Sequence, residues 1–235
     1  MQETGTRINK YMSQCGYCSR READRLIEKG EVWINGTLAT MGTKVMPGDT
    51  VMVHHTTITP CQKEYLLAFH KPAGIVCTTS KIDKNNVIDY LNFPERIYPV
   101  GRLDKDTEGF LLLTDDGETA HRLLAPGKHV EKKYYLQYEG TLCDDCVEQA
   151  ERGIDIGEKN LTRPAVLKLA GKGEAYLTIC EGKFHQVKRM IAALGGRVSY
   201  LKRISMGSLE LDKKLQPGDY RMLTEEEIDR IVKGE

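Results

Sequence analysis

The sequence lacks three features that would assign the protein to a broad class at once. It has no apolar run long enough to cross a membrane, and its first residues, MQETGTRINKYMSQ, do not follow the pattern of a signal peptide. We therefore expect a cytoplasmic protein without a membrane partner. It also lacks net charge, since 34 Lys and Arg balance 34 Asp and Glu. A neutral chain gives no general sign of nucleic-acid binding, so such binding must be argued from local clusters.

The spacing of the cysteines lacks the pattern of a zinc ribbon. The seven cysteines include two Cys-x-x-Cys pairs, Cys15/Cys18 and Cys143/Cys146. A zinc ribbon would separate two such pairs by about 15–20 residues, and these lie much further apart. Cys15 continues an apolar helical stripe, while the second pair lies at the start of an expected surface helix. We expect no metal site, and no disulfide in a reducing compartment.

The first block of the chain, residues 6–53, has the pattern of a small domain with helices first and a hairpin second. The second helical stretch begins at a capping box formed by Ser19 and Glu22 and ends at Gly30. An Asn-Gly pair between extended runs, WINGTL, then predicts a tight hairpin. The block carries five basic side chains, Arg7, Lys10, Arg20, Arg21 and Arg25. Composition alone favours a solvated helix face over phosphate contacts for these side chains.

A short polar stretch separates this block from the rest of the chain. Residues 54–63, HHTTITPCQK, are rich in Thr and contain Pro60, which predicts a linker. From about Glu64, strand-like and helix-like patterns alternate, so we expect one α/β or α+β domain there. The predicted boundaries are 1–57 for the first domain, 58–63 for the linker and 64–235 for the second domain.

The stretch GRLDKDTEGFLLLTDDG, residues 101–117, places acids where a calcium loop would have ligands. An EF-hand loop also needs a helix on each side and oxygen ligands in its second half. Here two prolines and a glycine precede the loop, and apolar Leu112 takes the ninth ligand position. GFLLLT predicts a buried strand, with Asp104 on the loop before it. From the residues alone, a turn-capping role is the simplest one for Asp104.

A helix is predicted in FHQVKRMIAALGG, residues 184–196. Its apolar residues recur with helical period and predict one buried face, Val187, Met190, Ile191 and Leu194, with Phe184 beside it. Lys188 would then lie on the flank of that face, from which a lysine can reach a half-buried carboxylate while its stem packs. Arg189 would point away from the core, toward solvent or a phosphate.

The first block resembles an S4 domain, a small RNA-binding module of ribosomal protein S4 and of many RNA-modifying enzymes. The resemblance rests on the R-x-x-K-Y start, the S-R-R-E-A helix entry, the V-x-I-N-G hairpin and the final P-G-D. It implies that the five basic side chains of the block contact RNA.

The second domain resembles the RsuA-type pseudouridine synthases. Four stretches carry the resemblance: FHKPAGIVCTTS, YPVGRLDKDTEGFLLLTDDG, EKKYYLQYEG, and the segment that begins EGKFHQVKRM. The resemblance implies an α+β protein whose catalytic domain has a mixed, mostly antiparallel sheet flanked by helices. It implies that Asp104 is the catalytic acid, that Tyr134 faces the uracil and that Lys188 pairs with Asp104. It also implies RNA contacts for Arg102, Lys132, His185 and Arg189.

Pseudouridine formation breaks the C1′–N1 bond of uridine, turns the base and rejoins it through C5. Because the product is an isomer, we expect no cofactor and no metal. Asp104 would either attack C1′ or remove a ribose proton, and in both cases it must be ionised in a dry pocket, which a neighbouring cation favours. Tyr134 and Tyr135 are neighbours on an expected strand, so only one of them can face that pocket.

The run His185-Gln186-Val187-Lys188 resembles the 16S rRNA uridine-516 enzyme of the family. We therefore expect rRNA or a pre-ribosomal small-subunit particle as the partner of a monomer. Three alternatives stay open from the sequence. They are a 23S rRNA enzyme of the same family, a ribosome-assembly protein that binds RNA without catalysis, and a glycoside hydrolase that pairs Asp104 with Asp106 or Glu108.

Overall fold

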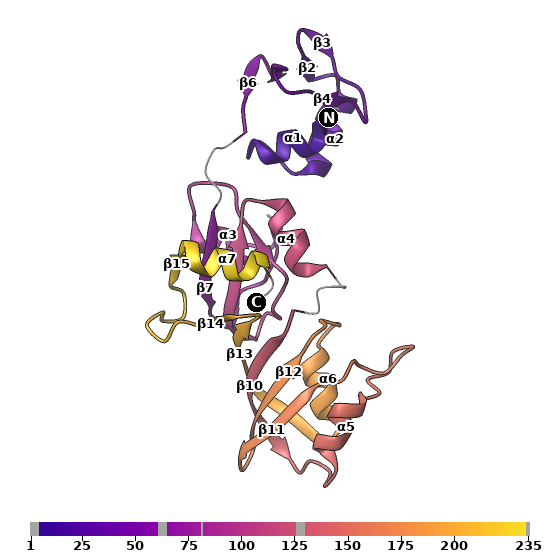
Figure 1. The fold of residues 1–235 in the computed structure, drawn as a ribbon, viewed down its shortest axis with the longest axis vertical. Coiled ribbons are helices and arrows are strands. Elements are labelled where there is room, and N and C mark those ends of the chain that lie inside the picture. The colour runs from indigo at the N-terminus through magenta and orange to yellow at the C-terminus, as the bar shows by residue number, and fades with distance from the viewer. Residues whose placement is uncertain (1–4, 61–64, 81, 126–129, 234–235) are drawn as a thin grey trace. The chain divides into compact units, whose positions relative to one another are not determined.

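The computed structural model describes residues 5–60, 65–80, 82–125 and 130–233, and it divides the chain into two compact units (Figure 1). The smaller unit consists mainly of the residues up to Tyr65, and the larger contains most of the chain from Leu66 onward. Residues 61–63 of the predicted linker lie outside the described residues. No helix in the described part of the chain is long and apolar enough to cross a membrane.

The smaller unit begins with the two helices that the sequence predicts. Ser19 caps the second helix, because its hydroxyl oxygen accepts a hydrogen bond from the Glu22 backbone N–H at 3.1 Å. Gly30 turns the chain after that helix with a φ of +73°, a conformation that glycine adopts without strain. The helices are α1 (Ile8–Gln14) and α2 (Arg20–Glu28).

A four-stranded sheet, ordered β3-β2-β5-β6, shares one apolar core with these helices. Cys15 and Cys18 pack against that core, as a packing role predicts. Ile58 is the last residue of β6 and is buried, so the sheet extends into the stretch predicted as linker. The prediction missed this because Thr-rich β6 has little apolar character of its own. The strands are β1 (Thr6–Arg7), β2 (Val32–Ile34), β3 (Thr37–Leu38), β4 (Lys44–Val45), β5 (Val51–Val53) and β6 (Thr56–Ile58).

The larger unit is built on a nine-stranded sheet, ordered β11-β12-β10-β13-β9-β7-β15, with β14 beside β13 and β8 beside β9. Its neighbouring strands run antiparallel except for β9 and β13, which are parallel. The predicted α+β class with a mixed, mostly antiparallel sheet is thus confirmed. The strands are β7 (Leu66–Lys71), β8 (Tyr98–Val100), β9 (Glu108–Thr114), β10 (Lys132–Gly140), β11 (Val166–Gly171), β12 (Glu174–Ile179), β13 (Gly196–Met206), β14 (Leu209–Glu210) and β15 (Tyr220–Met222).

Helices flank this sheet. Figure 1 shows α5 and α6 beside β10, β11 and β12, and residues of α4 and α7 join the apolar core formed with β7 and β9. The predicted face of α6 is buried at Val187, Met190, Ile191 and Leu194. Phe184 is not part of it, because the helix begins only at Gln186. The helices are α3 (Val87–Leu91), α4 (Gly117–Leu124), α5 (Cys146–Arg152), α6 (Gln186–Ala193) and α7 (Glu225–Lys233).

The parallel pairing of β9 with β13 joins the two halves of the sheet. It consists of two residue pairs, Lys202 with Glu108 and Arg203 with Gly109. Gly109 has a φ of +115°, and a Cβ atom there would collide with the backbone of Arg203. Glycine therefore lets the two backbones approach closely. The loop that carries Asp104 precedes β9 directly, so this pairing brings Asp104 next to β10 and β13.

Candidate active site

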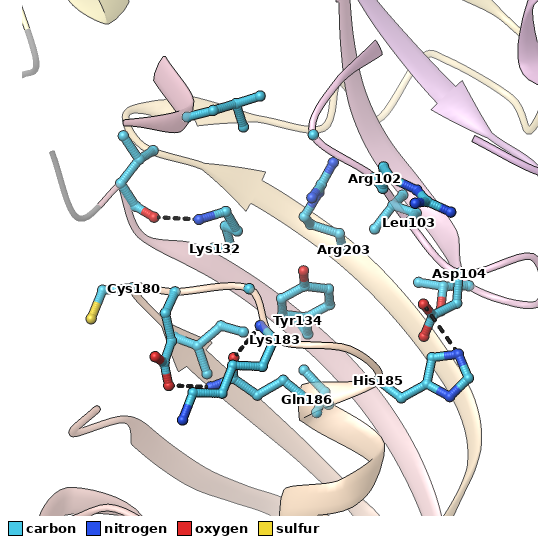
Figure 2. Close-up of a pocket in the computed structure, with 18 of the residues that line it drawn as sticks. Arg102, Leu103, Asp104, Lys132, Tyr134, Cys180, Lys183, His185, Gln186 and Arg203 are labelled. Atoms are coloured by element: carbon cyan, nitrogen blue, oxygen red, sulfur yellow. Dashed lines mark hydrogen bonds and ion pairs between the residues drawn. The ribbon is translucent and has the colours of Figure 1, made fainter. Parts of the chain in front are cut away.

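A pocket of about 630 Å³ lies in the larger unit, beside the junction of the two sheet halves (Figure 2). Its wall combines the loop before β9, strands β10 and β13, and the segment that leads into α6. Five residues that the sequence predicts as site residues line it: Arg102, Asp104, Lys132, Tyr134 and His185. Lys188 reaches the same place from the first turn of α6.

Asp104 faces two basic side chains. The Lys188 ammonium lies 3.5 Å from one carboxylate oxygen, and the His185 Nε2 atom lies 3.6 Å from the other. The Asp104 side chain is 29% exposed, so it is half-buried yet open to the pocket. Its backbone oxygen accepts from the Thr107 N–H at 3.1 Å, so the turn is closed by backbone atoms. The side chain is left to the pocket, unlike the turn-capping role that the residues alone favour.

Lys188 is shared between two carboxylates. Its ammonium donates a hydrogen bond to Asp106 at 2.6 Å, closer than its contact with Asp104. That hydrogen bond lowers the pKa of Asp106. Asp106 is 72% exposed, so water screens its attraction, whereas the contact with Asp104 is better shielded. The sequence predicts only the pairing with Asp104.

The buried Lys71 at the end of β7 holds the Asp104 loop from inside. Its side chain is 0% exposed, and its ammonium donates to four backbone oxygens. These belong to Thr107 (2.8 Å), Pro72 (3.0 Å), Asp104 (3.3 Å) and Lys105 (3.3 Å). Burial lowers the pKa of Lys71. We did not predict this residue as part of the site, although a lysine that ends the apolar run LLAFHK before Pro72 is the available signal.

Tyr134 is the tyrosine that faces the pocket. It is buried on β10 and pairs with Arg203 of β13, and Figure 2 shows its ring between Asp104 and Lys132. Tyr135 points to the opposite face of the sheet, where its ring contacts Tyr176 and Tyr200. The alternation of side chains along a strand therefore separates the two tyrosines as expected.

Two further cations, Lys132 and Arg203, line the pocket. Lys132 donates to the Val130 oxygen at 2.9 Å, and burial together with the nearby Arg203 guanidinium lowers its pKa. Arg203 is 1% exposed and donates to the Phe110 oxygen at 2.7 Å. Its buried Nη2 atom has no hydrogen-bond partner among the residues that the structure describes. Arg203 was not predicted, because nothing in the alternating pattern of β13 marks it as buried.

Arg189 has partners within the chain that the sequence does not predict. Its guanidinium pairs with Glu158 at 2.9 Å and donates to the backbone oxygens of Phe184 and Ile156. Its side chain is 30% exposed, and its contact with RNA stays a prediction. The sequence could not reveal these partners, because Ile156 and Glu158 belong to an irregular segment after α5.

In the smaller unit, the predicted phosphate contacts lie on α1, α2 and the residue before α1. Arg20, Arg21 and Arg25 are exposed, as is Arg7. Arg25 forms an ion pair with Glu22 at 3.1 Å on the surface, a contact that is readily exchanged because both side chains are well exposed. Within the described residues, no group of three His, Cys, Asp or Glu side chains is placed to hold a metal ion.

Comparison with known families matches both units. A model of the RNA pseudouridylate synthase family matches residues 65–193, and a model of the S4 domain matches residues 6–51. The chain belongs to the RNA pseudouridine synthase family. The expectation of an enzyme that acts on RNA and carries an S4 domain is thus confirmed, and the glycoside hydrolase alternative is wrong.

Relatives of this pseudouridine synthase match it along nearly the whole chain. The "Uncharacterized RNA pseudouridine synthase YtzG" of Bacillus subtilis is 41% identical over 94% of this chain and 96% of its own length. The "Ribosomal small subunit pseudouridine synthase A" of Escherichia coli K12 is 38% identical over 96% of this chain and 100% of its own. The "Dual-specificity RNA pseudouridine synthase RluF" of the same strain is 35% identical over 98% of this chain and 80% of its own length. A solved structure described as "Crystal structure of pseudouridylate synthase" superposes with a TM-score of 0.71 at 34% identity, covering 97% of this chain and 100% of that one.

Proposed function

We propose that this pseudouridine synthase isomerises a uridine of 16S rRNA, with Asp104 as the catalytic acid. The observation that carries this proposal is the position of Asp104. Its half-buried carboxylate faces the Lys188 ammonium at 3.5 Å and opens into the same pocket as the Tyr134 ring. An adjacent cation favours the ionised form of a carboxylate, which is the form that the reaction needs.

The reaction divides between Asp104 and Tyr134. The ionised carboxylate attacks C1′ or removes a ribose proton, and the C1′–N1 bond breaks in either case. The Tyr134 ring then holds the free uracil by stacking while it turns. The C1′–C5 bond forms as the bond between Asp104 and C1′ breaks, or, in the other route, Asp104 returns the ribose proton. The proton on C5 is lost and N1 gains one, so atoms balance without a cofactor. The Tyr134 hydroxyl would assist the removal of the C5 proton.

Two features support a target in the small ribosomal subunit. The relative named as a ribosomal small subunit pseudouridine synthase aligns over its full length, and the His185-Gln186-Val187-Lys188 run resembles the 16S enzyme. The substrate is then 16S rRNA or a pre-ribosomal small-subunit particle in the cytoplasm, bound by one copy of the chain. A 23S rRNA target remains the second candidate, because a relative that is not named for the small subunit is nearly as similar, at 35% against 38% identity.

The S4 domain, for which we propose the boundaries 1–57, supplies affinity. Its cations Arg7, Lys10, Arg20, Arg21 and Arg25 would contact phosphates and position the RNA without reading its sequence. In the larger domain, Arg102 at the pocket rim, Lys132 in the pocket and His185 beside Asp104 would contact the nucleotide that enters. Lys188 would act on Asp104 itself.

The test uses three substrates: a 16S rRNA transcript, a 23S rRNA transcript and small-subunit particles from cells. Each is incubated with the wild-type protein, and pseudouridine is counted by chromatography of digested nucleosides and then mapped. We expect one new pseudouridine in 16S rRNA or in the particle. A new pseudouridine only in 23S rRNA would overturn the small-subunit target and keep the activity. Free uracil, or no change in any substrate, would overturn the proposed reaction.

A further inference from the structure

Phe184 lies exposed between Lys183 and His185, two residues that line the pocket, shortly before α6. It is 74% exposed, although Val187, Met190 and Ile191 of that helix are buried. A single exposed apolar side chain is ordinary on a protein surface, so exposure alone assigns nothing to it. The contacts around Phe184 are what make it unusual.

The Phe184 ring is stacked on the ring of His185. Their centroids lie 3.8 Å apart with an angle of 18° between the planes. His185 lines the pocket, and its Nε2 atom lies 3.6 Å from Asp104. The two rings therefore form a short stack that starts beside the catalytic carboxylate and ends at the outward side of Phe184.

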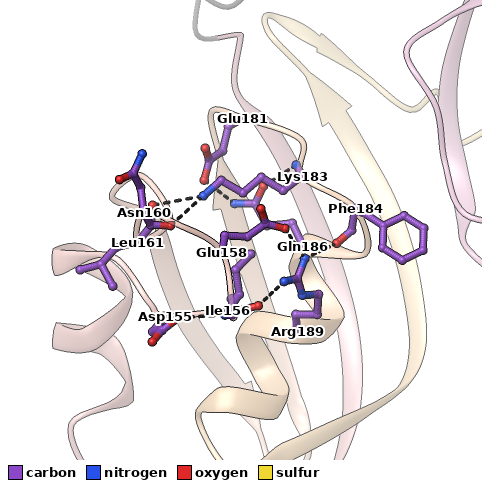
Figure 3. A network of polar contacts seen from close by, with 11 residues as sticks. Asp155, Ile156, Glu158, Asn160, Leu161, Glu181, Lys183, Phe184, Gln186 and Arg189 are labelled. Atoms are coloured by element: carbon purple, nitrogen blue, oxygen red, sulfur yellow. Dashed lines mark hydrogen bonds and ion pairs between the residues drawn. The ribbon is translucent and has the colours of Figure 1, made fainter.

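The segment that carries this stack is fastened by hydrogen bonds to its backbone (Figure 3). Arg189 donates to the Phe184 oxygen at 3.1 Å, and the Gln186 side chain accepts from the Lys183 N–H at 2.9 Å. The Lys183 ammonium in turn donates to the oxygens of Asn160 and Leu161 at 3.1 and 3.2 Å. Figure 3 shows the Phe184 ring directed away from this polar network. The ring is thus held in place before any ligand arrives, which reduces the entropy lost on binding.

We propose that Phe184 is a stacking platform for an unpaired nucleobase next to the uridine that enters the pocket. The inference rests on the proposed function and adds a second nucleotide to it. An enzyme that acts on a base inside RNA must remove it from the stack, which leaves its neighbour without one stacking partner. RNA-binding proteins commonly offer an aromatic side chain to such a base, and the 3.8 Å spacing of the two rings is that of stacked planes.

The surroundings of Phe184 favour a nucleotide over an apolar protein segment. Its sequence neighbours are Lys183 and His185, and Arg189 binds its backbone oxygen. An apolar partner would need a continuous apolar patch, whereas a nucleotide combines one flat ring with a negative phosphate. Every base has a flat face, so the platform should tolerate different bases at this position.

The binding test uses the full chain and two probes. Each probe is an unstructured nine-nucleotide RNA with one central uridine and 2-aminopurine on its 5′ or its 3′ side. Stacking quenches 2-aminopurine fluorescence, so we expect one of the two probes to be quenched by the wild-type protein. Phe184→Leu should remove the quenching and weaken binding at least about fivefold, the lower limit for the loss of one stacked base. Phe184→Trp should restore both.

A matched control and an abasic probe separate stacking from a general effect on the surface. Leu169→Ala removes an exposed apolar side chain from β11 and should leave binding and quenching as in the wild type. An abasic nucleotide at the quenched position should weaken binding to the wild type but not to Phe184→Leu, because the two changes remove the same contact.

Three results would overturn the platform: no quenching of either probe, quenching that Phe184→Leu retains, or equal losses from the abasic probe in both proteins. None of them depends on turnover. A failure of the proposed reaction, seen as rRNA without pseudouridine, is therefore distinguishable from a failure of the platform.

Discussion

Two segments of the catalytic domain meet at Asp104, and they are held in opposite ways. The segment 101–107 is fixed from inside by Lys71, which is fully buried and donates to three backbone oxygens of this segment. The segment 181–185 is fixed from outside by Arg189, which is 30% exposed and shares its guanidinium with the acidic side chain of Glu158. Water can replace the outer contacts but not the inner ones. The comparison indicates that the position of the acid is specified more strictly than the position of the rings beside it.

The largest expected effect concerns Asp104, the residue of segment 101–107 to which we assign the chemical step. Asp104→Asn keeps the shape of the side chain and removes its charge, so we expect turnover to fall by about 10⁴-fold or to background. RNA binding and thermal stability should change little. Single-turnover assays on rRNA measure turnover, filter binding measures the affinity for RNA, and thermal denaturation measures stability.

Asp106→Asn is the matched control, because Asp106 contacts the same Lys188 ammonium but is well exposed. We expect it to retain turnover to within about fivefold, as surface ion pairs contribute little. If Asp106→Asn were as inactive as Asp104→Asn, or if Asp104→Asn lost less than about tenfold in turnover, the catalytic role would belong elsewhere.

The next effect tests the hydrogen bonds by which the buried Lys71 holds the segment 101–107. Lys71→Met leaves several buried oxygens without a donor, and each such loss costs about 1–3 kcal/mol. We expect the free energy of unfolding to fall by about 3 kcal/mol or more and turnover to fall with it, since Asp104 loses its support. Chemical denaturation and single-turnover rates measure both. Lys168→Met, at an exposed position on β11, should change neither. Wild-type turnover by Lys71→Met would show that the segment 101–107 keeps its shape without the hydrogen bonds of Lys71.

A smaller effect tests the contacts by which Arg189 holds the segment 181–185. Arg189→Met should loosen the segment 181–185 and raise the RNA concentration for half-maximal rate by about threefold, with less than about 1 kcal/mol lost in stability. The salt dependence of binding identifies the reason. If Arg189 only holds its own chain, the slope of log affinity against log salt stays the same. A slope reduced by about one would mean that Arg189 contacts a phosphate.

The smallest effect on activity is expected away from both segments, where α7 meets β15 and the expected change is in stability alone. Arg221 donates to Glu227 at 2.7 Å from two nitrogens, and this lowers the pKa of Glu227 from 4.5 to about 2. A carboxyl whose pKa is lower in the folded state stabilises above its unfolded pKa. The contribution is lost as the pH falls from about 4.5 to about 2. We expect Glu227→Gln to cost about 1–2 kcal/mol at pH 7 and much less at pH 2.

Chemical denaturation of both proteins at pH 7 and pH 2 measures this difference, and Glu225→Gln, in the same helix, is the control. An equal loss at both values of pH would mean that shape and not charge is responsible. In that case, any loss of stability at low pH would come from other carboxyl groups.

Much of the fold could be predicted because local patterns agree with the final structure. The capping box at Ser19, the apolar run of β9 and the periodic face of α6 are local signals, and each element formed where it was expected. Two local predictions failed because the pattern of residue types nearby did not decide where the strand or helix begins or ends. Ile58 lies in a strand only because β5 pairs with it, and Phe184 was counted with α6 although the helix begins later.

The site was predicted where a short motif carries it and missed where distant segments supply it. Asp104 and Tyr134 come from recognisable stretches and line one pocket, and Lys188, from another such stretch, contacts Asp104. Lys71 contacts oxygens more than thirty residues further along the chain, and the partners of Arg189 lie on an irregular segment far from α6. Such contacts depend on topology, which a pattern of residue types does not encode.

The two-residue parallel pairing of β9 with β13 also has a consequence for the order of folding. It joins Gly109 to Arg203, almost a hundred residues later, and contacts between such distant residues form slowly because a long loop must first close. During synthesis the first half of the sheet can fold early, but Tyr134 and Asp104 cannot face each other until β13 has been made. The chain should therefore acquire its affinity for RNA, through the S4 domain, before it acquires the ability to modify RNA. A nascent enzyme would bind its substrate class while still unable to change it.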